Sequence, residues 1–206
     1  MRGLKGALIN DFYLMRTQSF GIYLMGTAGM LIIAVMLDNP DIMVWAQMFV
    51  LTMAPLAALE SSIASFANRW NVFEKAYSIS PVQMVLSRYI IFIFLSLLCA
   101  ALWTVSPFTV SYYVQSNFFR VDFLVYMIQL LCIIYYPVMY FLNPNKSSSG
   151  VVISFASALG AVLLSNFVIT PLADENRLLI IAAIAAMYVV SIFVSVLFDK
   201  RNRGRA

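Results

Sequence analysis

Histidine is missing from this sequence, and charged residues and cysteines are scarce. The 206 residues include no His and two Cys, and 11% of them are charged. A chain without His lacks the commonest general base, the commonest metal ligand and the usual pH switch. Cys99 and Cys132 lie in separate apolar runs, as small core residues do, and not in the close spacing of a metal or redox pair. We therefore predict no catalytic residue, no metal ligand and no cofactor on this chain.

The shortage of charge also argues against an ordinary soluble domain. Soluble domains carry about 25% charged residues, whereas 63% of this chain is hydrophobic. A chain this apolar cannot cover itself with polar surface, so lipid must act as part of its solvent. Its 13 basic residues lie between apolar blocks and not along one stripe, which argues against nucleic acid as a partner.

Six apolar segments have the length of membrane spans. A bilayer core needs about 20 helical residues, and about 17–25 are tolerated. The predicted spans lie near residues 19–37, 42–66, 83–105, 121–142, 150–172 and 177–198. We therefore predict an all-α integral membrane protein, with residues 1–206 forming a single domain of six transmembrane helices.

Basic residues are distributed unequally between the two sides of this topology. If the N-terminus is inside, the outer segments hold only Arg120 and Arg177, and the inner segments hold the other 11 of the 13. Lys and Arg collect on the cytoplasmic side of membrane proteins. We therefore expect the N- and C-termini in the cytoplasm.

The N-terminal segment, residues 1–18, has the pattern of an amphipathic helix. At 100° per residue, one side of it collects Leu4, Leu8, Phe12 and Met15, with Lys5, Asp11 and Arg16 also on the segment. This pattern favours a helix that lies in the inner interface before the first span. The alternative is a basic lead-in that only sets orientation.

The loop between the second and third spans contains a second short amphipathic segment. Trp70, Phe73 and Tyr77 share one helical face, and Pro81 ends the segment. Such a face is suited to docking on a partner, with an interfacial anchor as the alternative. The residues that we assign to coupling are Arg69, Trp70, Phe73, Glu74, Lys75 and Tyr77.

The second span carries polar residues inside its apolar run. Glu60 lies near its inner end, and Gln47 and Thr52 lie farther along. An intramembrane carboxylate is costly and is a functional hypothesis by default. The structural alternative, which we favour, is that Glu60 pairs with Arg69 or Arg88, or reaches toward water.

Two further groups lie near the predicted inner boundary. Tyr135, Tyr136 and Tyr140 are spaced as part of an aromatic belt, because tyrosine is enriched at membrane–water interfaces. The basic tail at 200–205 is interpreted as an anchor to anionic lipid.

Two local motifs carry a resemblance to a known family. The opening Asn10-Asp11-Phe12 is similar to a Lys-Asp-Phe triplet before the first span, with Asn10 in place of the Lys. The inner loop resembles a pattern of Trp, Tyr, a Ser-Leu-Pro-Val turn and Ser-Lys-Tyr. Here that pattern reads Trp70, Tyr77, Ser78-Ile79-Ser80-Pro81-Val82 and Ser87-Arg88-Tyr89. Together with the hydropathy pattern, these motifs resemble the membrane subunits of type-2 (ABC-2 type) exporters, six-span permeases whose ATPase is a separate polypeptide.

The resemblance implies an N-terminal connector helix, a coupling helix in the first inner loop, and two permeases on two ABC ATPase subunits in a bacterial cytoplasmic membrane. The chain has no GxxxxGKS or GxxxxGKT phosphate loop, so ATP and Mg are expected on the partner ATPase. The implied function is export of hydrophobic or amphipathic substrates, peptides or lipophilic drugs. Alternatives are an ion-coupled secondary carrier, which would want more midplane acids than Glu60, or a non-transporting immunity or sensor subunit.

Overall fold

The computed structural model describes residues 2–16, 21, 25–26, 28–29, 32–33, 36, 55–62, 79–105, 121–142, 147–165, 169 and 176–203. Its helices are α1 (Arg2–Met15), α5 (Pro81–Val105), α7 (Val121–Leu142), α8 (Ser147–Leu164) and α10 (Arg177–Arg203). Residues 55–62 are also helical, and no β-strand occurs in any of these ranges. The all-α prediction is confirmed for this part of the chain.

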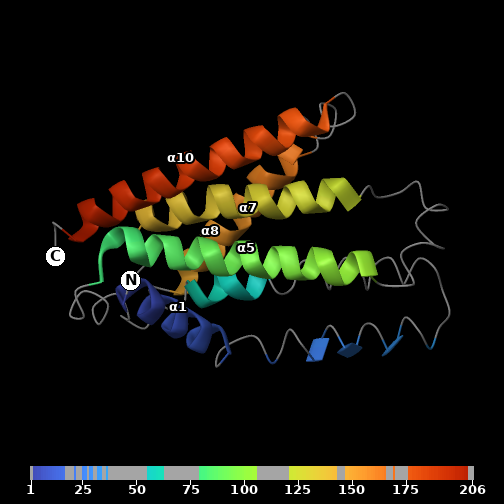
Figure 1. Ribbon diagram of the computed structural model, residues 1–206, viewed down its shortest axis with the longest axis horizontal. Helices are drawn as coiled ribbons and strands as arrows, with labels where there is room; N and C mark the ends of the chain where they lie inside the picture. The colour runs from blue at the N-terminus through green and yellow to red at the C-terminus, as the bar shows by residue number, and fades with distance from the viewer. Residues whose placement is uncertain are drawn as a thin grey trace.

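Three of these helices are long and apolar enough to cross a membrane, namely α5, α7 and α10. They lie side by side along the long axis of the molecule (Figure 1). The predicted spans 83–105, 121–142 and 177–198 fall on them, and 150–172 overlaps α8. Six membrane crossings remain a prediction, because the first two predicted spans and the loop 106–120 lie largely outside the described residues.

The helix α7 is the centre of the described bundle. It packs against α10 and α8, α10 also packs against α5, and α1 lies across α5 (Figure 1). The most deeply buried side chains of the core include Tyr89, Phe92, Leu130, Met139 and Ile153, each with 2% exposure or less. Both chain termini lie at the same end of the molecule.

The start of α5 is fixed by a reciprocal pair of hydrogen bonds. The Ser80 Oγ accepts from the Gln83 N–H at 3.3 Å, and the Gln83 Oε1 accepts from the Ser80 N–H at 3.2 Å. This is a capping box, which satisfies two backbone donors at a helix N-terminus. Pro81 follows as the first helical residue, where its missing N–H costs nothing. Ser80, which interrupts the family-like turn, is therefore the N-cap residue of α5.

A series of hydrogen-bonded hydroxyl groups crosses the bundle. It ends at a backbone carbonyl of α7 that has no helical N–H donor because of Pro137. Pro137 lies inside α7, and a proline has no N–H for the carbonyl four residues earlier, that of Ile133. The Ser191 Oγ on α10 donates to this oxygen at 2.7 Å. Because that uses the only hydroxyl proton of Ser191, the Tyr89 OH must donate to Ser191 at 2.6 Å and accept from Ser195 at 3.1 Å. These bonds join α5, α7 and α10.

We expect Ser191→Ala to destabilise the protein by about 1–3 kcal/mol, because it removes the donor to the partly buried Ile133 carbonyl. Pro137→Ala supplies a backbone N–H for the same carbonyl, so Ser191→Ala should cost less in that background. Thermal unfolding of both single variants and the double variant in detergent measures this coupling. Ser96→Ala is the matched control, because Ser96 is buried on α5 and its Oγ has no hydrogen-bond partner in the described structure. Equal costs of Ser191→Ala in the two backgrounds would contradict the assignment.

The interpretation of Tyr135, Tyr136 and Tyr140 as an aromatic belt is wrong. All three side chains are fully buried in the bundle. The Tyr135 OH donates to the Leu59 carbonyl at 3.1 Å, and the Tyr140 OH accepts from Arg88 at 3.0 Å. A phenol that finds a protein partner for its hydroxyl can be buried and need not lie at the interface.

Candidate functional site

The face by which α1 docks on α5 differs from its predicted apolar face. The buried residues are Ala7, Asp11 and Leu14, whereas Phe12 is 54% exposed. At 3.6 residues per turn, Ala7, Asp11 and Leu14 define a helical face that is turned by roughly 90° from the predicted face. The helix therefore docks through a face with an acidic residue at its centre.

Asp11 is bound where it meets α5. The Ser87 Oγ donates to the Asp11 Oδ2 at 2.5 Å, and the Arg88 Nε lies 4.0 Å from the Asp11 Oδ1. Arg88 is 2% exposed and Asp11 is 6% exposed. An ion pair this deep is costly to desolvate, and either charge becomes much more costly once its partner is removed. The contact therefore fixes α1 at one position on α5.

Arg88 extends the junction from α5 to α7 and α10. Its Nη1 donates to the Tyr140 OH at 3.0 Å, and its guanidinium lies 5.5 Å from the centre of the Tyr140 ring. At that end of α7 the Asn202 Nδ2 donates to the Tyr140 carbonyl at 2.6 Å. This carbonyl lies in the last turn of α7, where a helix lacks internal donors. We call Asp11, Ser87, Arg88, Tyr140 and Asn202 the α1 junction.

Burial governs the charge state of the acidic residue in the α1 junction. It raises the pKa of Asp11 above 3.8, while the charge of Arg88 and the hydrogen bond from Ser87 act in the opposite direction. Ser87 also lies 2.9 Å from the Met84 carbonyl, and one hydroxyl proton serves both acceptors. The junction therefore favours the protonated carboxyl more than water does.

The end of α10 is hydrogen-bonded to the segment at the start of α5. The Arg203 Nε donates to Asp199 at 2.8 Å, and its Nη1 donates to the Ile79 carbonyl at 2.8 Å. The interpretation of the tail as a lipid anchor is thus wrong for Arg203, which contacts protein, whereas Lys200 and Arg201 are exposed. Hydropathy does not reveal the partly buried backbone carbonyl before α5 that accepts the hydrogen bond from Arg203.

Some of the predicted site residues lie in the part of the chain that the structure describes, and others lie outside it. Leu4 and Leu8 are partly buried on α1, Asp11 is buried, and Met15 is the last residue of the helix. Glu60 is exposed at residues 55–62, and Arg88 contacts Asp11 and Tyr140. Gln47, Thr52 and all the coupling residues, Arg69, Trp70, Phe73, Glu74, Lys75 and Tyr77, lie outside the described residues.

Sequence reasoning did not assign Ser87, Arg88, Tyr140 or Asn202 to a functional site. A signal in the sequence could have identified Ser87 and Arg88. The Arg stands at the start of an apolar run directly after the Ser, and the preceding amphipathic helix contains one acid. No comparable signal pointed to Tyr140 or Asn202, because their role depends on the packing of α7 against α10.

Comparison with known proteins identifies the family. The family described as "ABC-2 family transporter protein" matches residues 7–198. The chain belongs to the ABC-2 transporter family. Membership makes the chain a transport permease, which is a membrane subunit and generally not an enzyme. It also implies an ABC ATPase as partner. No curated protein and no solved structure matches this ABC-2 permease. The match includes Asp11, Ser87, Arg88 and Tyr140 but ends before Asn202 and Arg203.

Proposed function

We propose that this ABC-2 permease is the membrane subunit of an ATP-driven exporter whose ATPase is a separate polypeptide in a bacterial cytoplasmic membrane. The observation that carries the proposal is the family match across residues 7–198, from α1 through most of α10. Within that stretch the chain has no phosphate loop, so ATP and Mg bind the partner.

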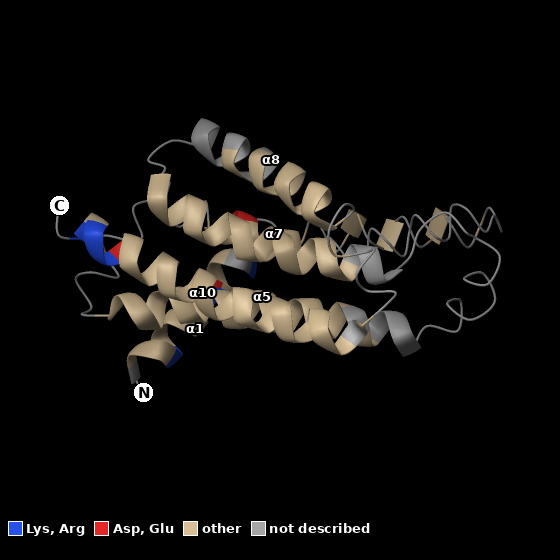
Figure 2. Cartoon of the chain, turned by 90° about the horizontal axis from the view of Figure 1, so that it is seen from above, with Lys and Arg blue, Asp and Glu red and all other residues tan. Residues whose placement is uncertain are grey.

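The arrangement of the helix ends supports a cytoplasmic location of both termini. Asn202 contacts the end of α7, and Arg203 contacts the start of α5. Both termini, the start of α5, the end of α7 and the end of α10 thus lie at one end of the bundle, as an even number of crossings requires. Figure 2 shows basic residues of α1 and α10 at this end. Basic residues collect on the cytoplasmic side.

The α1 junction gives this permease a physical route for coupling. In the proposed arrangement the ATPases dock below the membrane, against α1 and the loop around Trp70. Because Asp11 is bound to Ser87 and Arg88, a displacement of α1 is transmitted to α5. Arg88 and Tyr140 pass it to α7, and Asn202 passes it to α10.

The proposed assembly contains two copies of the permease and two ATPase subunits, with the translocation path between the permeases. The proposed substrates are hydrophobic or amphipathic, because the candidate spans α5, α7 and α10 offer few polar groups for a hydrophilic solute. Peptides and lipophilic drugs fit this description.

The test is purification in mild detergent with a tag on this chain, followed by reconstitution into liposomes with an amphipathic fluorescent peptide. A species with two permeases and two ATPases, and transport that requires ATP hydrolysis, supports the proposal. A permease that transports without ATP would contradict it and favour a carrier. A permease that binds no ATPase would favour an immunity or sensor subunit.

A further inference from the structure

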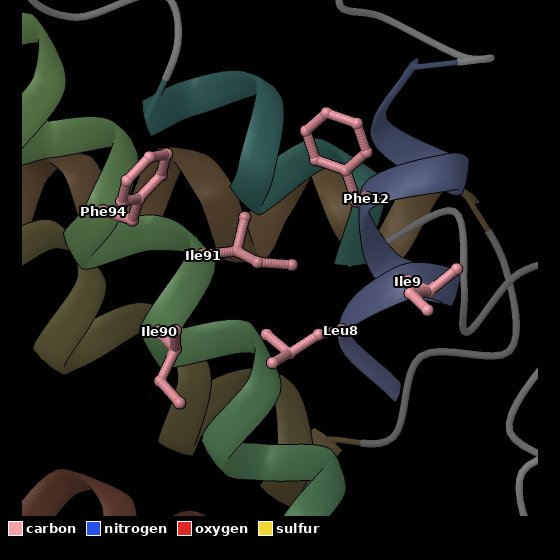
Figure 3. Close-up of a pocket in the computed structure, with 6 residues that line it drawn as sticks. All are labelled: Leu8, Ile9, Phe12, Ile90, Ile91 and Phe94. Atoms are coloured by element: carbon pink, nitrogen blue, oxygen red, sulfur yellow. The ribbon is translucent and has the colours of Figure 1, made fainter. Parts of the chain in front are cut away.

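An apolar groove of about 350 Å³ lies between α1 and α5. In Figure 3, Leu8 points from α1 toward α5, and Ile91 points from α5 toward α1. The groove is lined by Leu8, Ile9, Phe12, Ile90, Ile91 and Phe94. The docked face of α1, centred on Asp11, does not line it, so the groove is separate from the α1 junction.

Two basic residues flank the groove along α1. Helical geometry places Lys5 and Arg16 on the same stripe as Ile9 and Phe12, because Lys5 precedes Ile9 by four residues and Arg16 follows Phe12 by four. Lys5 and Arg16 are exposed, and they are about 16 Å apart along the helix axis. The single acid of α1, Asp11, is buried on another face. The rim of the groove on α1 is therefore positively charged.

The groove is continuous with an exposed apolar stripe of α5. Phe94, Leu97 and Leu98 are 61%, 65% and 44% exposed, and they follow Ile90 at helical spacing toward the far end of α5. In a membrane-spanning helix such a stripe faces hydrocarbon. An occupant that lies in the groove can therefore extend along α5 into the bilayer.

We propose that the groove binds one anionic phospholipid of the inner leaflet. The phosphate lies at the rim between Lys5 and Arg16, and an acyl chain lies against Leu8, Ile91 and Phe94. Cations on α1 and an apolar path along α5 match the two ends of such an amphiphile, whereas a soluble protein partner would not follow that path into hydrocarbon. The inference depends on α1 lying at the inner membrane surface, and it does not depend on transport.

The experiment uses the full-length permease in phosphatidylcholine nanodiscs. Each sample contains a trace of phosphatidylglycerol or phosphatidylcholine with a photoactivatable diazirine in the acyl chain. After photolysis, peptide mapping locates the labelled residues. We expect the groove to label more strongly with phosphatidylglycerol, by about fivefold for each basic residue at the rim. The exposed face of α10, around Phe193, should label equally with both probes.

The double variant Lys5→Gln/Arg16→Gln should lose the preference of the groove for phosphatidylglycerol. Lys200→Gln/Arg201→Gln removes the same charge from exposed positions of α10 and should retain it. All four side chains are exposed, so folding is expected to tolerate both changes. Equal labelling of the groove by the two probes in the unmodified chain would overturn the proposal and leave annular lipid only. Absence of labelling by either would overturn it in favour of a protein occupant. No ATPase is present, so neither result bears on the proposed export function.

Discussion

Asp11→Ala is expected to destabilise the permease by about 3–5 kcal/mol and to release α1 from α5. The substitution leaves Arg88, which is 2% exposed, without the carboxylate at 4.0 Å that compensates its charge. It also removes one of the two acceptors of the Ser87 hydroxyl. Thermal unfolding of the purified chain measures the loss of stability, and limited proteolysis near residue 16 reports whether α1 has been released.

The double variant Asp11→Ala/Arg88→Met separates the ion pair from the packing around it. If the cost of Asp11→Ala comes from an uncompensated buried charge, the double variant is more stable than the sum of the single effects predicts. Arg201→Ala removes an exposed cation of α10 and should change stability by less than about 0.5 kcal/mol. Strictly additive costs would show that Asp11 and Arg88 do not act as a pair.

Asp11→Asn tests the protonation state of the same residue. Because burial raises the pKa of Asp11 above 3.8, the folded protein binds the proton more tightly than the unfolded chain. The stability that comes from protonation of Asp11 is thus fully present below pH 3.8 and is lost as the pH rises through the folded pKa. The amide cannot ionise, so Asp11→Asn should remove this pH dependence while retaining an acceptor for Ser87.

Hydropathy predicted the helices well because a span needs only length and the absence of charge. The segments 83–105 and 121–142 correspond to α5 and α7, and the opening residues form α1. The proline in α7 did not end the helix, because Ser191 donates to the carbonyl that Pro137 leaves without a partner. Such compensation comes from a neighbouring helix and cannot be read from α7 alone.

The α1 junction could not be predicted from helical periodicity. Periodicity locates the apolar face of a helix, whereas α1 docks on α5 through a charged residue. The apolar face predicted for α1 contains Leu8 and Phe12, but the buried contact joins Asp11 to Ser87 and Arg88. The same limit explains Tyr140. In the sequence it is one more aromatic residue near a span end, and only the packing of α7 places it beside Arg88.

The inner loop of this permease remains a prediction from its sequence, and its test has a large expected effect. Trp70→Ala/Phe73→Ala is expected to abolish substrate transport and to leave membrane insertion intact. Aromatic hot-spot residues of an interface contribute about 2 kcal/mol or more each, so if both residues act as hot spots the two truncations should weaken docking of this loop on the ATPase by a factor of the order of 1,000. The α1 junction stays intact in this variant, so the bundle should unfold at the normal temperature.

Two measurements on the reconstituted complex separate coupling from folding. ATP hydrolysis should persist without stimulation by substrate, and uptake of an amphipathic peptide into inside-out vesicles should fall to background. Phe193→Ala removes an exposed Phe from α10 and is the matched control, with normal hydrolysis and uptake expected. Export at the normal rate by Trp70→Ala/Phe73→Ala would show that the loop only anchors the chain in the interface. Transmission to the ATPase would then depend on α1, whose contact with α5 contains a buried ion pair.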